Sequence, residues 1–409
     1  MEAAAALRNS PLALRSPPMS NVLTLAEARR AWRARQHLAA GPPLPLAELV
    51  TAVGGLPCPV GAAPALALVA RHALTHRSAL DQALFRDRTL ALVPGPRGLS
   101  WVVSAANAPA VRAFAVAEHA AREARLAAAC GLSSRDLLST RDAIRAALAR
   151  PRTSDALRDA LPREARRDLG EPGRRAACVT LAGLVLRGMW AVGEVDREPA
   201  EGRIDRDPWR YRLDPMPKVV PPAAEAVPKL SLDWIKAHAP VSVRAFAAAF
   251  GIANSRAVAA LKPHKLRSVS IEGLAGEHLV PEDFAVPEAD DSIAVDLLPV
   301  RDPLVDARPD LAGLCSPDIA RSSLVRQGNI APLILVDGAV VGTWAFDAAL
   351  SQLRARPIVP WSPALSAAID AHAEALAGFI ARELDPPTLH LAVALRAPAP
   401  RSASADLEL

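Results

Sequence analysis

The stretch VRAFAAAFGIANSRAVAAL, residues 243–261, decides the fold that we predict from the sequence. It predicts two short helices with a turn at Gly251, because glycine readily takes the left-handed conformation that ends a helix. Asn254 or Ser255 is suited to cap the second helix. Ala247, four residues before Gly251, leaves room for the helices to cross closely, as in a helix-turn-helix motif.

The flanking residues extend this motif to a winged helix over residues 223–288. LSLDWIKAHA, residues 230–239, places apolar side chains on one helical face, and Pro240 ends the helix. LRSVSIEG, residues 266–273, and GEHLVP, residues 276–281, alternate as strands do and predict the wing.

A similar order of elements begins the chain and predicts a first winged helix over residues 20–125. LTLAEARRAWRARQHL at 23–38 opens it, and LAELVTAVGG at 46–55 and PALALVARHAL at 64–74 follow as helices. TLALVPGPRGLSWVVS at 89–104 is predicted to be its hairpin.

The middle of the chain, residues 126–222, predicts a second winged helix. TSDALRDAL at 153–161 is its short helix, and residues 172–188 form a longer one with proline in the first turn. AVGEV at 191–195 and WRYRL at 209–213 are predicted as wing strands. The loop between them carries three arginines: Arg197, Arg203 and Arg206.

Residues 289–395 predict a β-rich domain. PLILVDGAVVGTWAF at 332–346 has Asp-Gly at its centre, the strongest short signal for a β-hairpin. SIAVDLLPV at 292–300 supplies another strand, and residues 362–384 form an amphipathic helix. The predicted fold class is therefore α+β, with three tandem winged helices and a β-rich C-terminal domain. Residues 1–19 are predicted to be a disordered extension, with Met19 as an alternative start, and residues 396–409 a loose tail.

Composition predicts a globular, cytoplasmic protein without cofactor, metal or membrane span. Apolar residues make up 51% and charged residues 22% of the 409 residues. The cysteines at 58, 130, 178 and 315 form no metal-ligand spacing and are expected to be reduced core thiols. The net charge of +5 comes mostly from arginine. Two explanations of the arginines stay open: a GC-rich genome, or a surface that binds phosphate.

Several short motifs follow one another at spacings that identify a family. They are Arg35-Gln36, VGGL at 53–56, Arg71, RGL at 97–99, LLPVRDPL at 297–304 and ILVDGAVVGTW at 334–344. Over residues 20–385 the chain resembles the tandem winged-helix proteins that include the bacterial AlkZ-type DNA glycosylases. The resemblance implies a C-shaped cradle for DNA and hydrolysis of the N-glycosidic bond of alkylated purines.

The family's catalytic motif is the point of departure. The family places Gln-apolar-Gln or Gln-apolar-Asp directly after G-G-L, whereas this chain has Pro57-Cys58-Pro59. Proline has no side-chain donor or acceptor, so both catalytic groups are absent. Cys58 is interpreted as a packed thiol and not as a replacement nucleophile. Two further departures are Ser100-Trp101, where the family tends to have His, and Arg301, where it usually has Phe.

These departures leave more than one function open. The first is a DNA-binding relative of the glycosylases with reduced or lost chemistry. The second is an active glycosylase with displaced catalytic groups, for which Asp81 and Ser100 are the nearest polar candidates. A transcription regulator is the third.

Arginines on the concave face are expected to contact the phosphates of double-stranded, possibly damaged, DNA. The resemblance assigns Arg35, Arg71 and Arg97 to this role, and the predicted helix start and wing add Arg174, Arg203 and Arg206. The protein is expected to act as a monomer.

Overall fold

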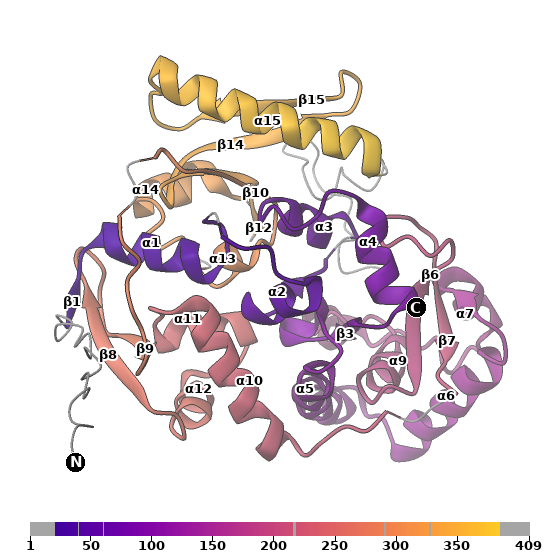
Figure 1. Ribbon diagram of the computed structural model, residues 1–409. Helices are drawn as coiled ribbons and strands as arrows, with labels where there is room; N and C mark the ends of the chain where they lie inside the picture. The colour runs from indigo at the N-terminus through magenta and orange to yellow at the C-terminus, as the bar shows by residue number, and fades with distance from the viewer. Residues whose placement is uncertain are drawn as a thin grey trace, which may run out of the picture.

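A computed structural model describes residues 21–384, except 40, 60, 216, 217, 290, 291, 309, 327 and 328 (Figure 1). The predicted N-terminal extension and C-terminal tail lie outside the described residues. Helices and several small sheets are mixed along the chain, which confirms the predicted α+β class. The number of winged helices stays a prediction, but each segment can be compared with the elements expected of it.

The third segment has the predicted order of helices and strands. Its elements are α10 Ala223–His238, α11 Val243–Phe250, α12 Asn254–Leu261, β8 Leu266–Ile271 and β9 His278–Pro281. Gly251 ends α11 with φ of 66°, in the left-handed region that the sequence predicted. The N-cap of α12 is Ala253, so neither Asn254 nor Ser255 caps it. Strands β8 and β9 pair antiparallel as the predicted wing.

The first segment also contains the predicted hairpin, but its opening helix packs elsewhere. Its elements are β1 Val22–Leu23, α1 Leu25–Arg35, α2 Leu46–Ala52, β2 Leu56–Pro57, α3 Ala62–Val69, α4 Arg77–Asp81, a π-helical turn Gln82–Arg86, β3 Leu90–Pro94, a 3-10 turn Pro96–Gly98 and β4 Ser100–Ser104. Strand β1 pairs in parallel with β8 of the third segment. On α1, Trp32 is buried and donates a hydrogen bond to the Pro240 carbonyl at 2.8 Å. Helix α1 therefore belongs to the core of the third segment.

The second segment departs from the prediction at its long helix. Helix α5 Ala108–Cys130 leads into it from the first segment. The elements that follow are α6 Ser134–Ala147, β5 Arg152–Thr153, α7 Ser154–Ala160, α8 Gly170–Arg175, α9 Leu181–Ala191, β6 Val195–Pro199 and β7 Trp209–Leu213. The single helix expected over residues 172–188 is wrong, because Ala177 has φ of 51° and breaks it. Thr180 then caps α9 by accepting from Gly183 N–H at 3.1 Å. The first wing strand begins at Val195, where the expected strand ended, so Arg197 lies on a strand.

The C-terminal domain is a four-stranded sheet covered by one helix. Its main elements are β10 Val295–Leu298, β13 Leu333–Val336, β14 Ala339–Asp347, β15 Gln352–Pro357 and α15 Pro363–Glu383. Between β10 and β13 lie α13 Pro303–Asp306, α14 Pro317–Ile319, a π-helical turn Ala320–Leu324 and the short strands β11 Val325–Arg326 and β12 Asn329–Ile330. Strands β13 and β14 form the predicted hairpin, with positive φ at both Asp337 and Gly338.

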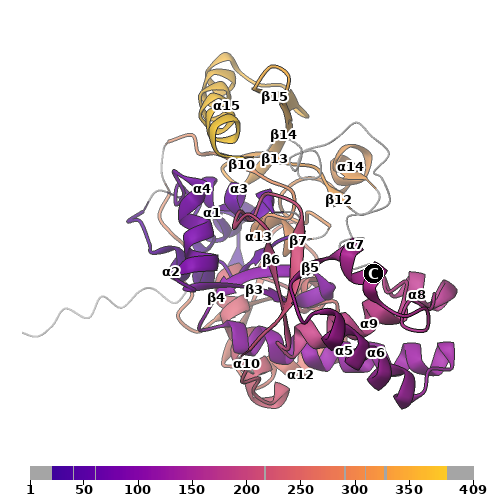
Figure 2. The ribbon, with the colours of Figure 1, turned by 90° about the vertical axis from the view of Figure 1, so that its right-hand side faces the viewer.

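Helix α15 passes the test of length and composition for a membrane span, although we expected no such stretch. Its most apolar window has a mean hydropathy of 1.2, and 33% of that window is buried. The helix lies along β15 at the top of Figure 1 and in Figure 2. Ile369 and Ile380 on its inner face are buried in a core that includes Leu56 and Leu66 of the first segment. This packing is that of the core helix of a globular domain.

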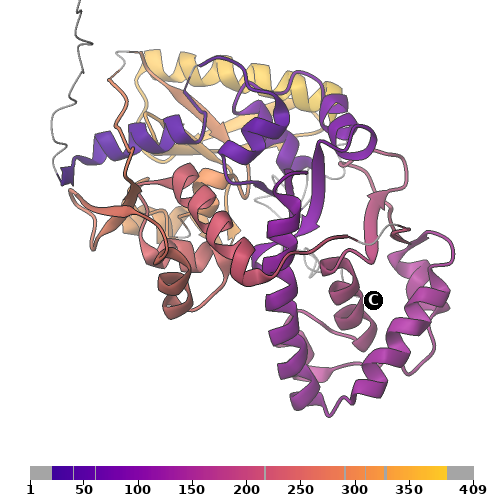
Figure 3. The same ribbon diagram turned by 60° about the horizontal axis from the view of Figure 1, so that its bottom comes forward.

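Three main cores hold the molecule together, and they cross the predicted segment boundaries. One joins α1, the third segment and part of the C-terminal domain. Another joins α2 and α3 to the C-terminal sheet and α15. The third lies within the second segment. In Figure 3, α5 runs from the centre of the molecule into the second segment, which lies apart from the third.

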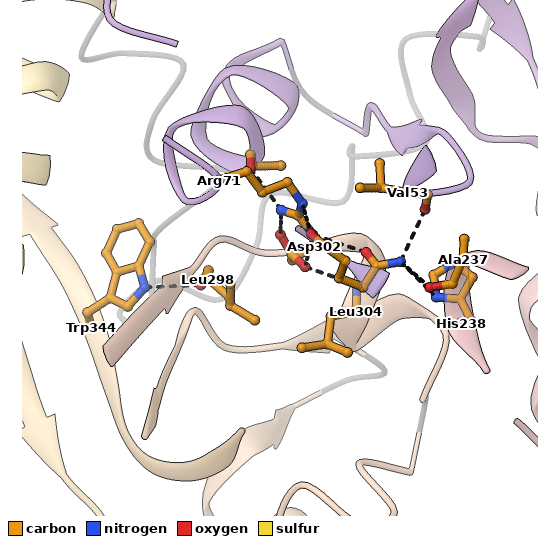
Figure 4. Close-up of polar contacts among 10 residues, drawn as sticks. Val53, Arg71, Ala237, His238, Leu298, Asp302, Leu304 and Trp344 are labelled. Carbon is orange, nitrogen blue, oxygen red and sulfur yellow. Dashed lines mark hydrogen bonds and ion pairs between the residues drawn. The ribbon is translucent and has the colours of Figure 1, made fainter. Parts of the chain in front are cut away.

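A buried polar cluster, the Arg71 cluster, links these parts (Figure 4). The Arg71 guanidinium donates to both oxygens of Asp302, at 2.7 and 3.1 Å, and both side chains are fully buried. Its other donors reach the Gln36 carbonyl at 2.9 Å, Gln36 Oε1 at 3.1 Å and the Ala67 carbonyl at 2.8 Å. All five N–H groups of the guanidinium therefore have acceptors.

Gln36 extends the Arg71 cluster toward the third segment. Its side-chain amide donates to the Ala237 carbonyl at 2.8 Å and lies 3.3 Å from His238 Nδ1. It also donates to the Val53 carbonyl at 3.4 Å. The cluster thereby joins the end of α1, the turn after α2, the end of α10 and the start of α13.

We expect Asp302→Asn to destabilise the fold strongly. The substitution keeps the shape of the side chain but leaves the buried Arg71 charge without its counter-ion, which costs about 3–5 kcal/mol. Denaturant unfolding measures the change. Asp142→Asn is the matched control, because Asp142 is exposed and paired with Arg145 at 3.2 Å, so it should change the stability by about 0.5 kcal/mol at most. Equal effects of the two substitutions would contradict the central role of the pair.

His238 predicts a loss of stability in mild acid. Burial, together with the positive charges of Arg308 and Arg71, holds the pKa of His238 well below its ordinary value. The unfolded chain takes up a proton near pH 6.5 while the folded ring stays neutral, so this contribution to stability falls as the pH drops below about 6.5. The slope reaches about 1.4 kcal/mol per pH unit. His238→Asn should flatten the pH dependence of unfolding, whereas His372→Asn, at an exposed site, should leave it unchanged.

Candidate functional site

The catalytic slot, residues 57–59, begins on the short strand β2. Gly54 and Gly55 turn the chain into this strand with φ of 82° and 90°, conformations that other residues rarely adopt. A side chain at position 55 would lie 3.1 Å from the Trp101 ring. Strand β2 pairs antiparallel with β4, with Pro57 opposite Trp101. The two glycines therefore fix where the slot lies.

The slot itself has no group suited to activating water. Pro57 is buried and Pro59 half-buried, and neither side chain can donate or accept a hydrogen bond. Cys58 is buried, and burial raises the pKa of its thiol to about 12. At neutral pH the thiol is protonated and a poor nucleophile. These observations agree with Cys58 as a packed thiol.

A loop of the second segment packs against the end of the slot. Ile204 and Asp205 lie between β6 and β7 and are buried. The Ile204 carbonyl lies so close to Gly61 that a side chain at position 61 could not fit. Sequence reasoning missed this loop contact, although an apolar residue between charged ones, RID at 203–205, was a signal for it.

A network of charged side chains holds the 203–205 loop against α4. The Asp81 carboxylate accepts from Ile204 N–H at 2.9 Å and pairs with Arg77. Asp205 pairs with Arg203 at 2.9 Å and with Arg77 at 3.7 Å. Asp81 is thus a structural partner of the loop, which makes it a poor candidate for a displaced catalytic group. Ser100 pairs through its backbone in β4 and its carbonyl accepts from Cys58 N–H at 2.7 Å.

The comparisons with known proteins agree with this geometry. A family model described as DNA glycosylase AlkZ-like matches residues 50–379. The chain belongs to the AlkZ-like DNA glycosylase family. Among solved structures, the DNA glycosylase AlkZ of Streptomyces sahachiroi has a similar fold, with a TM-score of 0.70 and 17% identity over 88% of this chain and 98% of that chain. No curated protein matches the sequence.

Membership of the AlkZ-like family makes DNA the macromolecule on which the chain is expected to act, but one predicted phosphate contact needs correction. Arg71 lies in the buried cluster with every donor occupied, so it is not available to a phosphate. Arg203 pairs with buried Asp205 and donates to the Glu383 carbonyl at 3.3 Å, and its side chain is 26% exposed. Its role in binding DNA stays a prediction.

The other predicted arginines remain accessible to different degrees. Arg35 is half-buried, donates to the Lys236 carbonyl at 2.8 Å and lies over the Phe284 ring. Arg97 pairs with Asp306, and its side chain is 22% exposed. Arg174 and Arg206 have side chains 55% and 42% exposed, in ion pairs at the surface. Their roles in binding DNA stay predictions.

Gly61→Ala tests whether the 203–205 loop is packed as tightly as the structure shows. Gly61 has helical φ and ψ of −59° and −29°, so alanine suits its own backbone conformation. Only the backbone of Ile204 and Asp205 opposes the added side chain. We expect a loss of about 1–3 kcal/mol in stability, typical of overpacking. Gly41→Ala is the control, because nothing lies within 4 Å of a side chain there. A stabilising effect of Gly61→Ala, measured by thermal unfolding, would contradict the packing.

Proposed function

We propose that this AlkZ-like protein binds duplex DNA as a monomer and releases alkylated bases far more slowly than glycosylases with the Gln-apolar-Gln motif, or not at all. The observation that carries the proposal is the slot. At the two positions where the family's motif supplies polar side chains, this chain has Pro57 and Pro59.

The chemistry explains why these positions matter. An N7-alkylated purine is already cationic and leaves without a general acid. The enzyme must hold a water molecule at C1′ and stabilise the positive charge that develops on the sugar. An amide or carboxylate oxygen does both, and a proline ring does neither.

The surroundings of the slot support the same conclusion. The thiol within the slot, that of Cys58, is buried and protonated, and the carboxylate of Asp81 is engaged by Ile204 N–H and Arg77. The loop at Ile204 covers the residues that follow the slot. A displaced active site would therefore depend on Ser100, which lies half-buried on β4.

Binding and excision draw on different residues. Phosphate contacts need exposed cations, which Arg174 and Arg206 supply without any contribution from the slot. Such contacts position a protein on DNA regardless of sequence. The proposal is thus a DNA-binding function that survives loss of the hydrolytic groups, in damage recognition or regulation of repair.

Base release from duplex DNA that contains N7-methylguanine tests the proposal. Loss of one group that stabilises a transition state typically costs about 10²–10³-fold in rate, and here two are absent. We expect release near the spontaneous rate, together with salt-dependent binding of the same duplex measured by fluorescence anisotropy. Rapid, enzyme-dependent release would overturn the proposal of reduced activity.

Restoring the motif identifies the cause. Pro57→Gln combined with Pro59→Gln should raise the release rate if the scaffold keeps the family's geometry. Cys58→Ala is the control and should leave both binding and release unchanged. If the wild type is active, Ser100→Ala examines the remaining polar candidate, and loss of activity there would establish a displaced site.

A further inference from the structure

A hollow lies where the three helical segments meet. It is lined by the turn between β3 and β4, by α5 and α9, and by the turn between α11 and α12; these helices lie in the lower half of Figure 1. Its empty space of about 530 Å³ includes space that is open to solvent. We call it the junction hollow.

The junction hollow is rich in positive charge. Three arginines line it, Arg97, Arg122 and Arg187. Among its described lining residues the one carboxylate is Glu118, which faces Arg256 of α12 at 2.5 Å. Arg97 is balanced by Asp306, but Arg122 makes no hydrogen bond or ion pair with the part of the chain that the structure describes. The balance of charge therefore favours an anion.

Backbone geometry brings Arg122 into the hollow. Gly98 has φ of 73°, and a side chain there would lie 3.3 Å from Nη1 of Arg122. The absence of a side chain at Gly98 thus lets the guanidinium approach the turn between β3 and β4. Gly251 plays a comparable part for Arg97, whose Cγ lies 3.0 Å from the site of a side chain at 251.

We propose that the junction hollow binds one phosphate group of the DNA backbone, with Arg122 as its main ligand. A phosphate offers several acceptor oxygens and at least one negative charge, which matches the guanidinium of Arg122 in a hollow lined by two further arginines. The residues that line the hollow do not include those of the slot. The DNA as source of the phosphate rests on the proposed function, whereas the phosphate chemistry rests on the hollow alone.

Two variants and one control test the proposal on the full chain. Arg122→Gln removes the charge at a half-buried position, and Arg122→Lys keeps the charge without the planar guanidinium. Arg150→Gln makes the same change of charge at an exposed residue without a partner among the described residues. Affinity for undamaged duplex is measured over a series of salt concentrations, and binding of inorganic pyrophosphate by calorimetry.

We expect Arg122→Gln to weaken duplex binding about tenfold and to lower the salt slope by about one. Arg122→Lys should weaken binding less than Arg122→Gln and leave the slope unchanged, and Arg150→Gln should change neither. If the wild type binds duplex and Arg122→Gln behaves as the control does, the junction hollow is not a phosphate site, although the proposed function stands. If the wild type binds no duplex, the proposed function fails, and the binding of pyrophosphate then tests the junction hollow by itself. Pyrophosphate binding that Arg122→Gln abolishes supports a site for a free phosphate compound. The absence of pyrophosphate binding overturns the phosphate site.

Discussion

The buried ion pair between Arg71 and Asp302 is the interaction on which the arrangement of the chain depends. Both side chains are fully buried, and the guanidinium occupies all of its donors with Asp302, Gln36 and the Ala67 carbonyl. A buried pair of this kind is weak evidence for net stability, because two charges must lose their water. The pair favours this arrangement of the segments, because here all five donors of the guanidinium have acceptors. Through Gln36 the ion pair is also linked to the Val53 carbonyl. Val53 directly precedes Gly54 and Gly55, which fix the position of the slot.

This role explains which part of the sequence reading succeeded. Local patterns predicted the helix-turn-helix at Gly251, the hairpin at Asp337 and Gly338, and α15, because turn residues and periodicity act within a few residues. The motifs that identified the family were also found in the right order. The role of Arg71 was nevertheless misjudged, because its counter-ion Asp302 lies far along the chain and only tertiary packing brings the two together. An arginine in a basic protein looks the same in sequence whether it binds phosphate or a buried carboxylate.

The remaining differences have the same origin in tertiary contacts. The helix expected over residues 172–188 breaks near Ala177, where the chain folds back so that Cys178 N–H bonds to the Gly173 carbonyl at 2.8 Å. A side chain at Gly173 would collide with the Cys178 carbonyl, so glycine permits the break. Periodicity alone favours one continuous helix there. Likewise, Ile204 packs against Gly61 of another segment. The apolar residue between charged ones at 203–205 indicates burial but does not identify its partner.

The slot shows how the scaffold accommodates proline at the positions where the family's motif places polar side chains. Proline removes a backbone N–H and is normally excluded from sheet interiors, but β2 lies at the edge of its sheet, in the order β2-β4-β3. Pro57 is therefore tolerated where a central strand would reject it. Gly54, Gly55 and Gln36 fix the position of the slot. They are separate from the side chains that would act on substrate. The residues at positions 57 and 59 can therefore differ from the family's motif while the Arg71 cluster keeps the turn in place. Exposed arginines and the junction hollow lie outside the slot, so binding of DNA is subject to a different set of constraints from hydrolysis.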